Sequence, residues 1–165
     1  MRTSSRRARA LVAVSVATTL ALLTVIVPVA AATPQQPVTI VSNVTFADPG
    51  EPNFGDFETS GSATDRGLVC ESGTFVDTFL RFGGFQRDNG LVQVLVRKEL
   101  TCDDDSGTFV VQLRITANFD TGIESFTWVV LGGTGDYAHL RGGGTGSTVP
   151  TDTGNINTYV GFLLH

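Results

Sequence analysis

The chain has 165 residues with 11 basic and 16 acidic side chains, a formal net charge of −5 at pH 7. An acidic protein repels phosphate backbones and anionic lipid head groups, so this charge argues against nucleic acid and membrane surfaces as partners. The length suits one domain with a single core, and the abundance of Gly, at 19 residues, disfavours a helical protein.

The first 32 residues have the pattern of a secretory signal peptide. Four arginines within the first nine residues precede an uncharged apolar run from Leu11 to Ala32. Small residues at Ala30 and Ala32 predict cleavage after Ala32, which leaves a secreted domain over residues 33–165. An uncleaved anchor is the alternative, because the run approaches the roughly 20 apolar residues that cross a bilayer. Without this segment, 7 basic residues remain against 16 acidic ones, a net charge of −9.

Cys70 and Cys102 are the only cysteines of the chain. Exported proteins meet an oxidising environment, in which a pair of cysteines usually forms a disulfide. We therefore expect a Cys70–Cys102 disulfide.

Beyond residue 32, short runs rich in Val, Thr and Phe alternate with Gly, Asp and Asn, which is typical of a sandwich or barrel. Apolar and polar residues alternate along these runs, as in strands with one buried face. The predicted strands are Val38–Phe46, Phe54–Ser60, Leu68–Phe82, Leu91–Cys102, Thr108–Phe119, Ser125–Leu131, Ile156–Leu164 and, as a further possibility, Tyr137–Thr148.

The clearest alternation assigns one face of Thr108–Phe119 to the interior. Matching faces of the neighbouring strands then contribute Val92, Val94, Val96, Phe126, Trp128 and Val130 to the same interior. The outer face receives Gln93, Arg97 and Glu99 beside Gln112 and Arg114. Because an antiparallel meander of this kind is left with exposed edges unless it closes, we predict an all-β fold closed into a single eight-stranded β-barrel.

The same reasoning predicts how Leu68–Phe82 pairs with Leu91–Cys102. A fold-back about Gln86 aligns apolar residues across the two strands and sets the two cysteines opposite each other. The predicted partners are Leu80 with Val92, Thr78 with Val94, Val76 with Val96, and Cys70 with Cys102. This register leaves Phe75, Asp77, Phe79 and Arg81 on the outer face.

The segment Gly132–Ala138 contains the G-x-G-x-x-A spacing of a dinucleotide-binding fingerprint. That motif needs a helix after the glycines to receive a pyrophosphate. The following residues, His139–Gly144, cannot sustain a helix. We therefore interpret the segment as a structural glycine turn formed by Gly132, Gly133, Gly135 and Tyr137.

The sequence WVVLGGTGDYAHLRGGGTG, from Trp128 to Gly146, resembles a segment shared by dirigent proteins and allene oxide cyclases. Those families fold as eight-stranded antiparallel barrels with an apolar cavity, often as trimers, and use no cofactor. The resemblance implies this fold, a possible homo-oligomer and no cofactor or metal, but it transfers no catalytic residue. The chain also resembles small exported proteins of actinobacteria.

Five residues are candidates for the lining of an interior cavity: Phe109, Phe119, Phe126, Trp128 and Lys98. The four aromatic residues are equally compatible with a solid core. Lys98 falls between apolar residues of the interior face, where it either binds an anionic head group at the cavity mouth or extends to solvent. The run Asp103–Asp105 lacks the ligand spacing of a calcium loop and is interpreted as an acidic hairpin turn.

Three functions stay open at this point. The first is an exported barrel that binds a small apolar molecule in its interior. The second is a cofactor-independent cyclase or dirigent-like coupling protein, in which a cavity shapes a reactive substrate. The third is a structural or protein-binding component of the cell envelope.

Overall fold

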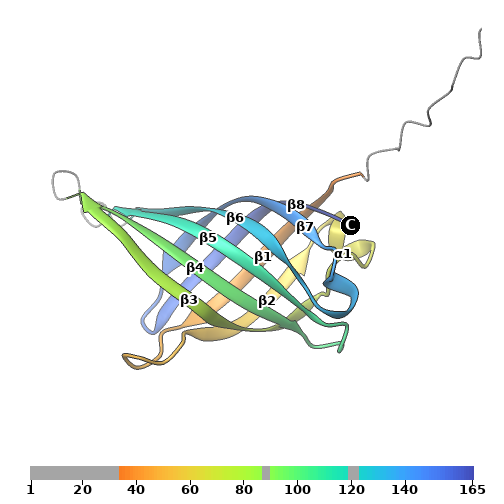
Figure 1. Ribbon diagram of the computed structural model, residues 1–165, viewed down its shortest axis with the longest axis horizontal. Coiled ribbons are helices and arrows are strands. Elements are labelled where there is room, and N and C mark those ends of the chain that lie inside the picture. Colours follow the sequence, from red (N-terminus) through yellow and green to blue (C-terminus); the bar gives the residue numbers. More distant parts are fainter. Residues whose placement is uncertain (1–33, 87–89, 119–122) are drawn as a thin grey trace, which may run out of the picture. The chain divides into compact units, whose positions relative to one another are not determined.

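Eight antiparallel strands wrap around one axis and close into a barrel (Figure 1). The computed structural model describes residues 34–86, 90–118 and 123–165, so the predicted signal peptide and Phe119 lie outside the described residues. The elements in chain order are β1 (Gln36–Thr45), β2 (Phe54–Ser60), α1 (Ser62–Asp65), β3 (Ser72–Gln86), β4 (Leu91–Cys102), β5 (Thr108–Asn118), β6 (Ile123–Gly133), the 3₁₀ helix η1 (Gly135–Tyr137), β7 (Arg141–Pro150) and β8 (Gly154–Leu164).

The first and last strands close the barrel. β1 pairs with β2 on one side and with β8 on the other, in register from Gln36 opposite Leu163 to Thr45 opposite Gly154. Closure satisfies backbone groups that would otherwise form two exposed edges. The predicted all-β, eight-stranded antiparallel barrel is therefore confirmed, including a strand at the Gly-rich segment, which is β7.

The interior face predicted for the central strands is also confirmed. On β5, Phe109, Val111 and Leu113 are at most 1% exposed. Residues of the same face on β4 and β6 are buried with them: Val92, Val96, Phe126, Trp128 and Val130. On the outer face, Arg97 Nε donates a hydrogen bond to Gln112 Oε1 at 3.1 Å, as their predicted proximity requires.

The predicted pairing of β3 with β4 is wrong. Cys102 lies opposite Gly73, not Cys70, and Phe75 lies opposite Leu100. This is an offset of three residues, and an odd offset exchanges the two faces of a strand. Phe75 is therefore buried at 2% exposure, whereas Val76, predicted to be inside, is 43% exposed.

A β-bulge at Thr78 changes the offset from three to four residues. Asp77 is paired with Lys98, but Phe79 is paired with the next residue along β4, Arg97. One extra residue in β3 makes the offset even, so Phe79 and Arg81 lie on the outer face as predicted. Leu80, predicted to be inside, is nevertheless 49% exposed. A second register shift, between Phe82 and Phe85, changes the offset again, to five residues. The predicted register therefore fails along the whole strand, and the predicted faces hold for only part of it.

The disulfide lies at the end of the barrel that also carries α1, η1 and the C-terminus (Figure 1). Cys70 precedes β3 and bonds to Cys102 at the end of β4, with a Cα–Cα distance of 5.9 Å. The predicted bond is confirmed, but it joins a loop to a strand end instead of two paired strands. We call this the disulfide end and the opposite one, where β3 ends and β4 begins, the far end.

Glycines in the wall make room for large aromatic side chains in the interior. A Cβ on Gly146 would lie 2.2 Å from the Phe126 ring, and one on Gly161 would lie 2.8 Å from the Trp128 ring. The predicted glycine turn also has a structural role, because Gly135 adopts a φ of 57° at the start of η1. The described ranges contain no helix long and apolar enough to cross a membrane.

Candidate functional site

The disulfide half of the barrel interior is filled by apolar side chains. The Phe109 ring packs edge-on against Phe57 and Tyr137, with centroid distances of 5.9 and 5.5 Å. Leu140 and Leu163 are completely buried beside them. This half forms a close-packed core.

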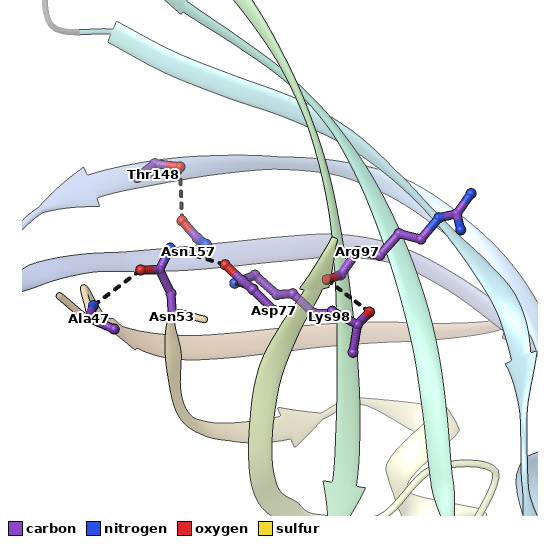
Figure 2. Close-up of polar contacts among 8 residues, drawn as sticks. Ala47, Asn53, Asp77, Arg97, Lys98, Thr148 and Asn157 are labelled. Atoms are coloured by element: carbon purple, nitrogen blue, oxygen red, sulfur yellow. Dashed lines mark hydrogen bonds and ion pairs between the residues drawn. The ribbon is translucent and has the colours of Figure 1, made fainter. Parts of the chain in front are cut away.

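The half of the interior toward the far end contains a chain of polar contacts (Figure 2). The Lys98 ammonium group lies 2.7 Å from the Asp77 carboxylate, in the pair of residues just before the bulge. The Asn53 side chain donates to the other oxygen of Asp77 at 3.1 Å and accepts a hydrogen bond from the backbone N–H of Ala47 at 3.2 Å. The buried carboxylate therefore has two partners.

Lys98 neither extends to solvent nor reaches a cavity mouth. It is 3% exposed, and its ammonium group also lies over the Phe75 ring, 4.2 Å from the centroid. Burial lowers the pKa of Lys98, while the charge of Asp77 and its hydrogen bond act against that shift. The two roles considered from the sequence are thus replaced by a third, an internal ion pair.

Buried hydroxyl and amide groups continue the polar region across β7, β8 and β1. Thr148 donates to Asn157 Oδ1 at 2.9 Å (Figure 2). The hydroxyls of Ser42 and Tyr159 are buried nearby. Burial raises the pKa of the Tyr159 hydroxyl, while the side chains of Ser42 and Asn157 oppose that shift. Its proton is therefore held firmly, which makes Tyr159 a poor acid or base at neutral pH.

A carboxyl group stands at the edge of this polar region. Glu124 near the start of β6 is half-buried, and burial raises its pKa, while the Thr148 hydroxyl opposes that shift. None of the polar groups from Asn53 to Tyr159 borders any of the three cavities described below.

The largest of these three cavities is a cleft of about 820 Å³ that runs across β3 to β7 toward the far end. One cross-strand row of residues contributes much of its lining. The members of this row are Arg81, Leu95, Arg114, Thr127 and Thr145.

This cleft lies on the outer surface of the barrel wall. Side chains alternate between the two faces along a strand, and the neighbours of Leu95 and Thr127 in the sequence include the buried residues Val96 and Trp128. The row through Leu95 and Thr127 must therefore point outward. Among the inward-pointing residues of the lining, Phe126 is buried, whereas Val94 and Ile115 are half-buried.

The outward residues of the lining differ in length. Arg81, Gln93 and Arg114 are long, whereas the other outward residues of β3, β5, β6 and β7 in the lining are short: Gly83, Thr116, Ser125, Thr127 and Thr145. The resulting cleft combines hydroxyl groups, two guanidinium groups and the apolar side chain of Leu95.

The two other cavities are smaller and lie at the ends of the barrel. One of about 560 Å³ is formed around the turn between β1 and β2, lined by Phe46, Phe54 and Val76 among others. The other, of about 320 Å³, lies between Gln36, Leu68 and the C-terminal His165. Neither contains a group of long cationic and short hydroxyl side chains like that of the outer cleft.

The residues predicted to line a cavity occupy different environments. Phe109 and Trp128 belong to the packed core, Lys98 is ion-paired, and Phe126 borders the outer cleft from beneath. The sequence did place Arg81 and Arg114 on the outer face, but nothing indicated that this face is hollowed. The alternation of long and short outward residues across β3–β7 would have been the signal, and it requires the correct strand order and register.

Comparison of the chain with models of known protein families gives no match, and neither does comparison with curated proteins. The segment that carries the resemblance, Trp128–Gly146, comprises most of β6, η1 and the first part of β7. Its glycines serve the packing and turns described above.

Proposed function

We propose that this protein is an exported binding protein that holds a small, partly apolar molecule in the outer cleft across β3–β7. The volume of that cleft, about 820 Å³, is the observation that carries the proposal. Binding sites for small molecules typically have volumes of about 300–1,000 Å³ and combine apolar surface with a few polar groups. The cleft fits both criteria.

The interior, where the sequence led us to expect a ligand, offers less support. Tyr159, Phe57, Phe109 and Leu113 are among the largest of the fully buried side chains, and they occupy the space inside the wall. A cyclase or coupling protein would need a cavity next to groups that can transfer protons. Lys98 and Asp77 neutralise each other away from the three cavities, so binding is favoured over catalysis.

Export is part of the proposal. The apolar run that ends at Ala32 supports it, and so does the Cys70–Cys102 bond, which persists in oxidising compartments. A protein purified from the culture medium of its host should have the mass of a chain that begins at Thr33. A mass that includes the first 32 residues would contradict cleavage.

A neutral fluorescent probe tests whether the cleft binds apolar molecules. N-phenyl-1-naphthylamine becomes bright in apolar sites, and we expect it to bind the wild-type protein. Thr127→Trp places a large ring in the lining of the cleft. It should weaken binding of the probe at least tenfold, because the ring fills the cleft. The measurement is a fluorescence titration on protein whose circular dichroism spectrum matches the wild type.

The matched control is Thr74→Trp, which adds the same ring at an exposed outward position on β3 outside the cleft lining. Its affinity for the probe should equal that of the wild type. Equal binding by both tryptophan variants would place the bound probe elsewhere and contradict the proposed site. Failure of the wild-type protein to bind the probe would contradict the proposed function as well.

A further inference from the structure

The outer cleft brings cationic side chains together in a protein that is acidic overall. Residues 34–165 include 7 basic and 16 acidic residues, yet two of the seven, Arg81 and Arg114, border this one cleft. A third, Arg97, lies in the neighbouring outward row of β4. The local charge of the cleft is therefore opposite to that of the molecule.

Register sets the spacing of the two arginines. Arg81 on β3 and Arg114 on β5 are both paired with Leu95 on β4, one from each side. Two strand spacings separate their Cα atoms by about 10 Å, a distance across which two arginine side chains can approach the same small group. Leu95 lies between them and offers apolar contact below such a group.

Within the part of the chain that the structure describes, neither guanidinium group is engaged, because Arg81 and Arg114 form no ion pair and no side-chain hydrogen bond there. Arg97 differs, because its guanidinium group donates to Gln112 and stacks over the Phe79 ring at 5.2 Å. The donors of the two cleft arginines thus remain available to a ligand, whereas those of Arg97 are partly used.

We infer that the cleft binds its ligand through an oxyanion group, a carboxylate, sulfonate or phosphate, held between Arg81 and Arg114. This inference rests on the proposed function and adds the chemical class of the ligand. Guanidinium groups match the geometry of such oxyanions and can donate two parallel hydrogen bonds to them. The hydroxyls of Thr116 and Thr127 supply further donors, and Leu95 contacts the uncharged body of the ligand.

The overall charge favours a small molecule over a larger anion as the source of this group. A nucleic acid or an anionic membrane would have to approach the rest of a surface with a net charge of −9, which repels it. A single anionic group inside the cleft meets only the local positive charge, because salt screens charges more than about 8 Å away at physiological ionic strength.

Two probes with the same ring system test the inference. 8-Anilinonaphthalene-1-sulfonate carries an oxyanion, and N-phenyl-1-naphthylamine is its counterpart without one. Arg81→Gln and Arg114→Gln should each weaken binding of the sulfonate about threefold, and together about tenfold, as expected for exposed charge pairs. Binding of the neutral probe should change less than twofold in the same variants.

Arg97→Gln is the matched control, because it removes one positive charge from the same face outside the cleft lining. It should leave binding of the sulfonate within twofold of the wild type. If Arg97→Gln weakened sulfonate binding as much as Arg81→Gln or Arg114→Gln does, the effect would come from the overall electrostatic field of the surface. That result would overturn the inference. Unchanged sulfonate binding in the double variant would also overturn it, while binding of the neutral probe would still support the proposed function.

Two further outcomes separate the alternatives. An equal loss of both probes in the double variant would mean that the arginines only shape an apolar site, which overturns the inference. Co-sedimentation of the wild type with anionic phospholipid vesicles, abolished in the double variant, would identify a membrane surface as the source of the anion. That result would likewise overturn the assignment to a small molecule.

Discussion

Single residues determine how the barrel tolerates charge in its interior. Lys98 and Asp77 are both almost completely buried, and each would be costly to bury without the other. The sequence showed Lys98 on the interior face, but it could not show its partner, because Asp77 was assigned to the outer face by a register that the bulge at Thr78 invalidates. The partner of Lys98 therefore depends on the position of the turn and on two register shifts in β3, which the sequence pattern does not reveal.

The ion pair yields a stability prediction. Asp77→Asn leaves the Lys98 ammonium group buried without a counter-charge and should lower the free energy of unfolding by about 3–5 kcal/mol. The double variant Asp77→Leu with Lys98→Met removes both charges and should remain close to the wild type. Urea unfolding at neutral pH measures both. A double variant as unstable as Asp77→Asn would mean that the pair itself, and not the unpaired charge, accounts for the loss.

At the scale of elements, strand positions were predictable and strand pairing was only partly so. Alternation of apolar and polar residues identifies seven of the strands, because a strand of the barrel has one buried and one exposed face. The Gly-rich β7 lacks this alternation and was predicted only as a possibility. Around Thr78, the run Phe75–Phe82 contains apolar residues at both odd and even positions, so the pattern allows two registers. The disulfide was predicted correctly from composition, although the cross-strand geometry given for it was wrong.

The disulfide ties the segment before β3 to the end of β4, across a sequence separation of 32 residues. On the chain-entropy model, a loop of this length stabilises the fold by about 3–4 kcal/mol. Cys70→Ser should therefore lower the melting temperature markedly while the folded fraction keeps its circular dichroism spectrum. Reduction of the wild-type protein should produce a similar decrease, and an unchanged melting temperature in both samples would contradict this role.

At the scale of the whole molecule, the sequence predicted a closed barrel but not where its surface is hollow. Closure follows from an antiparallel meander whose edges need partners. The volume inside the wall depends on which large rings face which glycines, as Phe126 faces Gly146 and Trp128 faces Gly161. Those pairings fill the interior, so the largest described cavity lies outside the wall, where Arg81 and Arg114 border it.

The proposed site lies outside the barrel wall, and a titration followed by ¹H–¹⁵N NMR distinguishes it from a site in the interior. On addition of 8-anilinonaphthalene-1-sulfonate, we predict that the largest shifts occur at the backbone amides of Leu95, Arg114, Thr116 and Thr127. The amides of the interior residues Ser42, Asn157 and Tyr159 should change little. The largest shifts at those three interior residues would contradict the account and place the ligand inside the barrel.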